Sequence, residues 1–191
     1  VQLVKQTLEK ARSLGMAAVP YVRGKPLAED FVNAKAVMVA SYKALFNGHS
    51  KFGIRGAGLP VRTGAVILDD AHVSFSEVRD SFTLEVKAKE DRERYDELCT
   101  LFRGAFRSID RLGTFDDTVS GQSNVVIEVP YWAWHEQIDA ARALLRGDNG
   151  QDAPFAWPLL RDNLHLCHAI ISSDAFTVTS VLPLVNSFPT F

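Results

Sequence analysis

The stretch Gly64-Ala65-Val66-Ile67-Leu68-Asp69-Asp70-Ala71-His72 leads from four apolar residues directly into two carboxylates and a histidine. A short apolar run between glycine and charge is typical of a fully buried strand in a parallel sheet. The two aspartates would then lie at the carboxyl end of the strand, where open α/β sheets bind ligands. The alternative is a strand that ends in a solvated acidic turn, because aspartate is common in turns.

The composition is that of an ordinary globular protein. The chain has 191 residues, of which 47% are hydrophobic and 23% charged, enough for one domain or one domain with an insertion. The net charge of −2 gives no general attraction to nucleic acid, so such a contact would need a local patch or another part of the protein. No membrane span or signal peptide is recognisable, and we expect a cytoplasmic protein with no membrane partner.

The cysteines and neighbouring histidines do not form a metal-binding pattern. Cys99 and Cys167 stand far apart and outside any C-x-x-C pair, so we expect them to be reduced and buried. His165 and His168 have i, i+3 spacing, but no second ligand pair accompanies them. The sequence therefore disfavours a zinc site.

The first part of the chain alternates helical and strand patterns. Helical spacing and Gly15 predict a helix over residues 3–14, and Ser41 is the expected N-cap of a short helix. The basic segment 49–63 is expected to be a mobile loop. Strands are expected over 16–22, 36–40, 64–68 and 82–86, with a short helix over 71–80.

The second part is expected to be mostly helical. An apolar stripe predicts a long helix from Lys89 to Gly113, followed by a polar loop over 114–124. Trp132, Trp134 and Trp157 fit amphipathic patterns, which favours core packing over base stacking. Further elements are a strand over 125–129, a helix over 134–145, a helix over 154–166 with Pro158 in its first turn, and a hairpin of strands 169–171 and 176–179.

These patterns predict three segments within an α/β fold. Residues 1–86 form a parallel sheet with helices, residues 87–168 form a mostly helical insertion, and residues 169–191 return towards the core. The insertion would separate the acidic pair from the rest of the core.

Asp69 and Asp70 are the main candidates for chemistry. One carboxylate can bind Mg²⁺ while its neighbour orients or deprotonates a water. The order Asp-Asp-Ala-His excludes the D-x-D arrangement of aspartyl-phosphate enzymes, so phosphoryl chemistry would be water attack on a bound nucleotide. His72 either couples this site to a neighbouring segment or caps the following turn.

Three segments together resemble the first RecA-like domain of DEAD/DEAH-box helicases of superfamily two. Residues 66–72, Val-Ile-Leu-Asp-Asp-Ala-His, look like motif II, the Walker B element. Residues 39–45, Val-Ala-Ser-Tyr-Lys-Ala-Leu, resemble motif Ib, and residues 2–6, Gln-Leu-Val-Lys-Gln, look like the tail of motif Ia. Their order and spacing are more specific than any one of them. The resemblance covers about the first 80 residues and implies a partial RecA-like sheet of the P-loop NTPase type.

The resemblance also implies roles for individual residues. Asp69 would bind the nucleotide-associated Mg²⁺, Asp70 would replace the family's catalytic Glu, and His72 would couple ATP hydrolysis to nucleic-acid binding. Ser41, Tyr42 and Lys43 would contact the backbone of DNA or RNA. Asp70 departs from the family because its side chain is shorter, and a misplacement near ~1 Å can cost on the order of a hundredfold in rate.

Other motifs of the family are absent from this sequence. The Walker A motif, the Ser-Ala-Thr motif III and the second RecA-like domain with its arginine finger are missing, although a phosphate cradle and an arginine carry most of phosphoryl-transfer catalysis. We therefore expect a fragment of a helicase or translocase that is inactive alone. Mg²⁺, ATP, DNA or RNA and the remainder of the helicase would be partners in the intact parent, with no cofactor tightly bound here.

Two alternatives remain open. In the first, the protein is a non-enzymatic interaction module whose helical insertion docks a partner protein, and the acidic motif is vestigial. In the second, Asp69 and Asp70 act directly in a metal-dependent hydrolase or nuclease.

Overall fold

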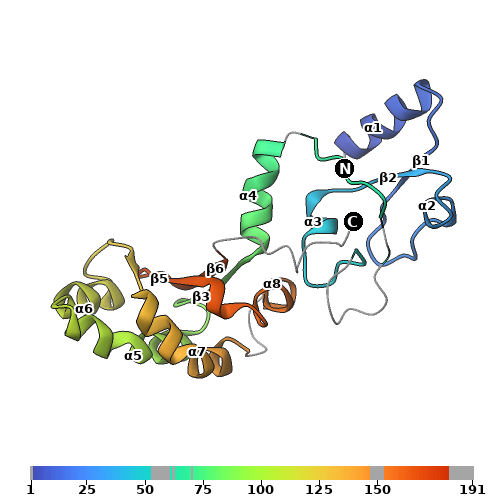
Figure 1. The fold of residues 1–191 in the computed structure, drawn as a ribbon. Coiled ribbons are helices and arrows are strands. Elements are labelled where there is room, and N and C mark those ends of the chain that lie inside the picture. Colours follow the sequence, from blue (N-terminus) through green and yellow to red (C-terminus); the bar gives the residue numbers. More distant parts are fainter. Residues whose placement is uncertain (1, 53–60, 62, 70, 147–152, 181–191) are drawn as a thin grey trace. The chain divides into compact units, whose positions relative to one another are not determined.

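The computed structural model describes residues 2–52, 61, 63–69, 71–146 and 153–180, shown in Figure 1. The chain forms two compact units that meet in sequence between Val78 and Arg79. Both contain helices and strands, so the fold is mixed α/β, with a small parallel sheet in the first unit and an antiparallel sheet in the second. No helix among these residues is long and apolar enough to cross a membrane.

The first unit is built on a pair of short parallel strands. Its elements are α1 (Gln2–Ser13), β1 (Ala18–Pro20), α2 (Glu29–Val32), β2 (Val37–Val39), α3 (Tyr42–Leu45) and the start of α4 (Ala71–Ser81). Ala18 pairs with Val37 and Pro20 with Val39, while α1 contacts both strands. Gly15 follows α1 with a φ of +74°, a left-handed conformation that suits glycine. The helix predicted over residues 3–14 and the strands predicted over 16–22 and 36–40 are thus confirmed, as α1, β1 and β2.

The buried strand expected over residues 64–68 is wrong. Residues 63–69 form neither helix nor strand, and Ile67 is 93% exposed. A buried strand of a parallel sheet needs neighbouring strands and helices on both faces. The parallel sheet of the described chain has only β1 and β2, each three residues long, and offers no such setting.

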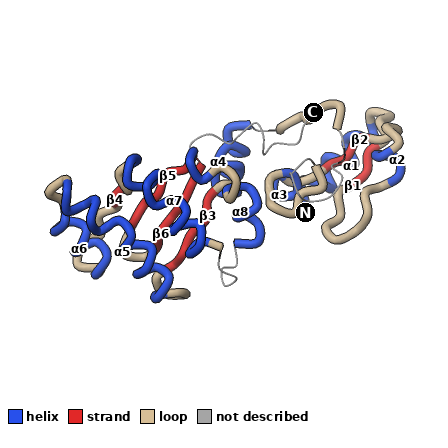
Figure 2. Tube along the Cα trace, turned by 60° about the horizontal axis from the view of Figure 1, so that its bottom comes forward, coloured by secondary structure: helices blue, strands red, loops and turns tan. Residues whose placement is uncertain are grey.

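The second unit contains a four-stranded antiparallel sheet, which Figure 2 shows beside its helices. The strand order is β3-β6-β5-β4, so β3 pairs with the last strand rather than with the next one along the chain. The elements are β3 (Thr83–Lys87), α5 (Arg92–Ser108), α6 (Leu112–Ser120), β4 (Ile127–Glu128), α7 (Tyr131–Leu145), α8 (Ala153–Leu160), η1 (Leu164–Leu166), β5 (Cys167–Ile171) and β6 (Ala175–Ser180).

Helices α5 and α7 cover one face of this sheet. Alternate strand residues such as Leu84 and Val178 are fully buried, while Thr177 and Glu85 on the other face are accessible. The rings of Phe102 on α5 and Phe176 on β6 stack with centroids 5.8 Å apart. The core of this unit therefore lies between the sheet and the two helices.

The helices of this unit differ in two places from the sequence-based expectation. The long helix ends at Ser108, Asp110 adopts a φ of +57°, and a separate helix α6 occupies most of the expected loop over 114–124. Burial of Phe115 explains why the polar segment folds back as a helix. The helix expected over 154–166 ends at Leu160, with a separate 3₁₀ turn at residues 164–166, and Pro158 lies inside α8 rather than in its first turn.

The hairpin and the strand before the helical segment are confirmed. β5 and β6 pair in antiparallel register around residues 172–174, with Ile171 opposite Phe176. β3 covers the expected strand over 82–86. β3 pairs with β6 and β4 with β5, so segments expected on both sides of the insertion share one sheet.

Candidate functional site

Asp69 lies in the exposed segment that leads into helix α4. This segment, residues 63–69, has no regular secondary structure, and Asp69 itself is exposed. His72 belongs to the first turn of α4, but its side chain lies outside the described part of the structure, as does all of Asp70. Of the three expected catalytic and metal-binding residues, the structure therefore shows the surroundings of Asp69 only.

Tyr42 connects helix α3 to this acidic segment. Its hydroxyl donates a hydrogen bond to the main-chain carbonyl of Asp69, 27 residues further along the chain. The Tyr42 side chain is half-buried, whereas the neighbouring Ser41 is exposed. Two segments singled out from the sequence for different roles are thus in direct contact.

Lys43 reaches the same region at a second point. Its ammonium Nζ lies 3.6 Å from Oε2 of Glu77 on α4, and the two side chains are 79% and 39% exposed. An ion pair this accessible adds little to stability, because water and salt screen it. Lys43 therefore remains available to an anionic partner from solvent.

Local hydrogen bonds define the ends of α3. Ser41 occupies the expected N-cap position with extended backbone, but its side chain makes no capping hydrogen bond. At the other end, Asn47 Nδ2 donates to the carbonyl oxygens of Lys43 and Ala44 at 2.5 and 3.4 Å. The carboxyl end of this short helix is therefore the better fixed end.

The described residues contain no group of three or more histidine, cysteine, aspartate or glutamate side chains placed to hold a metal ion. Magnesium in nucleotide sites is usually bound by one or two carboxylates together with phosphate oxygens and water. The exposed carboxylate of Asp69 fits one ligand position of that kind.

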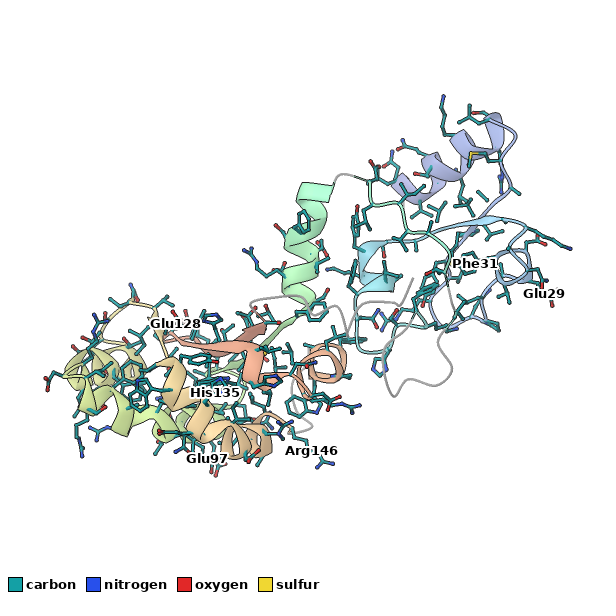
Figure 3. All side chains as sticks on the ribbon, viewed as in Figure 1. Glu29, Phe31, Glu97, Glu128, His135 and Arg146 are labelled. Atoms are coloured by element: carbon teal, nitrogen blue, oxygen red, sulfur yellow. The ribbon has the colours of Figure 1, made fainter. Side chains whose placement is uncertain are left out.

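The histidines near β5 point to separate partners. His168 Nδ1 hydrogen-bonds to a carboxylate oxygen of Glu128, and His135 Nε2 lies 3.1 Å from the carbonyl oxygen of His165. Figure 3 labels Glu128 and His135 among the side chains of this unit. His168 and His135 therefore contact different groups.

Both cysteines are free and buried, as expected. Burial raises the pKa of the Cys99 thiol to about 12, and burial has the same effect on Cys167. A thiol that stays protonated at neutral pH is a poor nucleophile. Neither cysteine is therefore a candidate catalytic residue.

The three tryptophans expected in the core differ in exposure, and Trp157 is half-buried. Trp134 is 1% exposed, which confirms its expected place in the core, whereas Trp132 is 45% exposed, so its expected burial is wrong. Trp132 lies next to Tyr131, which is 66% exposed and whose ring centroid is 4.2 Å from that of His135. The sequence pattern missed this exposed aromatic group, because adjacent helical positions point in different directions.

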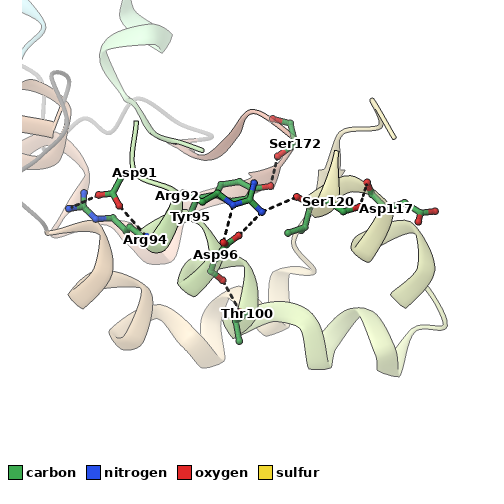
Figure 4. Close-up of polar contacts among 10 residues, drawn as sticks. Asp91, Arg92, Arg94, Tyr95, Asp96, Thr100, Asp117, Ser120 and Ser172 are labelled. Atoms are coloured by element: carbon green, nitrogen blue, oxygen red, sulfur yellow. Dashed lines mark hydrogen bonds and ion pairs between the residues drawn. The ribbon is translucent and has the colours of Figure 1, made fainter. Parts of the chain in front are cut away.

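Polar contacts on helix α5, shown in Figure 4, are structural. Asp91 caps the helix by accepting a hydrogen bond from the Arg94 amide, and Arg92 pairs with Asp96 at 2.9 Å. The hydroxyl of buried Tyr95 donates to the Ser172 carbonyl at 2.6 Å, joining α5 to the β5–β6 turn. These contacts fix the start of α5 and its position against the β5–β6 turn.

Neither protein-family models, nor curated proteins, nor solved structures give a match to this chain.

Proposed function

We propose that the chain is part of a nucleic-acid-dependent ATPase, a helicase or translocase. In this proposal the first unit belongs to a RecA-like domain, Asp69 is a ligand of the magnesium ion that accompanies ATP, and Asp70 orients the attacking water. His72 couples hydrolysis to nucleic-acid binding, and Ser41, Tyr42 and Lys43 lie at the nucleic-acid backbone. The phosphate cradle would come from a part of the parent outside this sequence.

The observation that carries the proposal is the hydrogen bond between Tyr42 and the main chain of Asp69. Tyr42 belongs to the segment that resembles motif Ib, and Asp69 belongs to the segment that resembles motif II. This hydrogen bond supports the proposal because it joins the segment that would contact nucleic acid to the segment that would act on a nucleotide.

The arrangement of the parallel strands supports the same proposal. β2 ends at Val39 and only Ala40 separates it from Ser41, so residues 41–43 lie beyond the carboxyl end of a parallel strand. Ligands of open α/β sheets bind beyond this edge.

In this proposal the residues of the chain have two chemical roles, binding of magnesium and activation of a water molecule. Bound magnesium would neutralise charge on the transferred phosphoryl group, and Asp69 would help to hold it. Asp70 would act as a general base or position a water through a hydrogen bond. Because the Asp70 side chain is shorter than the Glu of the family, the distance from its carboxylate to the attacking water would determine the rate of ATP hydrolysis by the parent.

The test is ATP hydrolysis by the full-length protein, with and without DNA or RNA. We expect nucleic acid to stimulate the wild type, and Asp69→Ala and Asp70→Ala each to abolish the activity. Asp30→Ala is the matched control, because Asp30 is an exposed aspartate on α2 of the same unit. Unchanged turnover in both Asp69→Ala and Asp70→Ala would refute the proposal.

A second candidate is a protein-docking role for residues 79–187. The supporting observation is the exposure of Val126, Tyr131 and Trp132, at 63, 66 and 45%. Exposed apolar and aromatic side chains of this kind are typical of protein interfaces. Loss of a partner in Tyr131→Ser/Trp132→Ser, with full retention in Asp69→Ala, would favour this role over the ATPase.

A further inference from the structure

Helix α7 begins with a solvent-facing group of aromatic and acidic side chains. Tyr131 and Trp132 are 66 and 45% exposed, and Glu136 and Asp139 are exposed one and two turns further on. We propose that this α7 face, formed by Tyr131, Trp132, Glu136 and Asp139, docks a basic segment of a partner protein. The inference rests on the docking role given above as the second candidate function, and it names the chemistry of the partner.

The α7 face places an indole ring beside a carboxylate. Residues three and four apart are neighbours on the surface of a helix, so Trp132 lies next to Glu136 and Glu136 next to Asp139. The core side of the helix is formed by other residues, namely Ala133, Trp134, Ala141 and Leu145. A Lys or Arg side chain of a partner would gain a cation–π contact with the ring and an ion pair with the carboxylate at the same place.

The Tyr131 ring is held in position although it is exposed. Its centroid lies 4.2 Å from that of the His135 ring, and His135 Nε2 lies 3.1 Å from the carbonyl oxygen of His165. A carbonyl oxygen can only accept, so His135 Nε2 carries the proton and donates it. An aromatic ring that is fixed before binding loses less conformational entropy when a partner covers it.

The charge of the α7 face selects among possible partners. Glu136 and Asp139 are both acidic, and Asp139 pairs only loosely with Arg142, at 3.8 Å and with its own side chain fully exposed. These carboxylates would repel nucleic acid, and a symmetric contact with a second copy would place acidic groups opposite each other. A protein segment that carries Lys or Arg beside apolar side chains complements both the acids and the rings.

The experiment measures the binding of two fluorescently labelled peptides to the chain by anisotropy. One peptide has alternating lysine and valine residues, and the other has alternating glutamate and valine residues. We expect the lysine peptide to bind at least about tenfold more tightly, since like charges across an interface are costly, and its affinity to fall as salt is added. Equal affinities for the two peptides would overturn the inference.

Single substitutions locate the binding on the α7 face. Trp132→Ser should weaken binding of the lysine peptide about two- to fivefold, as for an exposed cation–π contact, and Glu136→Gln by up to about fivefold. Glu97→Gln is the matched control, an exposed glutamate on α5 of the same unit, labelled in Figure 3. Circular dichroism checks that each variant is folded. If Glu97→Gln weakened binding as much as Glu136→Gln, overall charge would explain the binding and the inference would fail.

The remaining outcomes concern other occupants and the docking role itself. Self-association of the wild type that Trp132→Ser abolishes, measured by analytical ultracentrifugation, would assign the α7 face to a second copy and overturn the inference. Binding of a single-stranded oligonucleotide that Trp132→Ser abolishes would overturn it as well. If neither peptide binds, the inference fails, whereas the docking role is refuted only by a partner that Tyr131→Ser/Trp132→Ser retains.

Discussion

The indole N–H of Trp134 donates to the carbonyl oxygen of Leu164 at 2.8 Å and so joins helix α7 to the 3₁₀ turn η1 before β5. Both residues are buried, and the Trp134 ring lies 6.0 Å from that of Phe102 on α5. One side chain thus combines apolar packing with a hydrogen bond to a buried main-chain group. The stability of the second unit should depend strongly on it.

Trp134→Ala should lower the free energy of unfolding by about 3–5 kcal/mol, because it leaves a cavity and an unsatisfied carbonyl. Trp132→Ala is the control two positions earlier in the same helix, and it should cost far less because Trp132 is 45% exposed. Urea unfolding followed by circular dichroism measures both. Similar losses in the two variants would contradict the packing described for α7.

The hydroxyl of Tyr95 is predicted to stabilise the contact between α5 and the β5–β6 turn. Tyr95→Phe removes the donor to Ser172 and leaves the ring in place, which should cost about 1–2 kcal/mol in the free energy of unfolding. Tyr131→Phe should change stability little, since Tyr131 is 66% exposed. Chemical denaturation of both variants tests this, and a neutral Tyr95→Phe would show that water can replace the hydroxyl.

The exposure of Ile67 distinguishes the observed structure from a buried strand. Ile67→Asn should change the free energy of unfolding by no more than about 0.5 kcal/mol, as for other exposed sites. Leu84→Asn is the comparison, because Leu84 is 2% exposed on β3 and its replacement buries an amide. A large loss of stability in Ile67→Asn would mean that residues 64–68 form the buried strand after all.

The buried thiols predict a loss of stability at alkaline pH. Burial raises the pKa of Cys99 and of Cys167 from 9.0 to about 12 in the folded protein. The unfolded chain therefore releases these protons first, so their contribution is complete below pH 9 and is lost as pH rises towards 12.

Within that window the free energy of unfolding should fall by about 1.4 kcal/mol per pH unit for each thiol. Urea titrations on either side of about pH 9 measure the slope. The Cys99→Ala/Cys167→Ala variant should show a shallower dependence. Burial also raises the pKa of Tyr95, so some alkaline dependence should persist in that variant, and an identical slope would rule out the thiols.

The spacing of apolar residues predicts an element correctly where the element forms from local sequence signals alone. The helices α1 and α5, the parallel strands β1 and β2 and the β5–β6 hairpin follow from apolar spacing, glycine and turn residues. The run from residue 64 to 68 failed because an apolar strand forms only beside a suitable sheet. Its sequence says nothing about whether such a sheet is present.

The candidate site shows the same division. Residue type and the family resemblance point to Asp69 and to residues 41–43. No rule of sequence, however, predicts the hydrogen bond from Tyr42 to a carbonyl oxygen 27 residues away. The pairing of Lys43 with Glu77 depends likewise on where α3 and α4 meet. Such contacts are set by tertiary structure, and no pattern within a single sequence reveals them.

The pairing of β3 with β6 has a consequence during biosynthesis. Thr83 and Thr179, whose hydroxyls are 2.8 Å apart across this pair, are separated by 96 residues in the chain. β3 leaves the ribosome long before its partner strand exists, so helices α5 and α7 can form early while the sheet must wait. Throughout that interval β3 lacks the only strand with which it pairs in the described structure, so the sheet can be completed only after almost the whole described chain has been made.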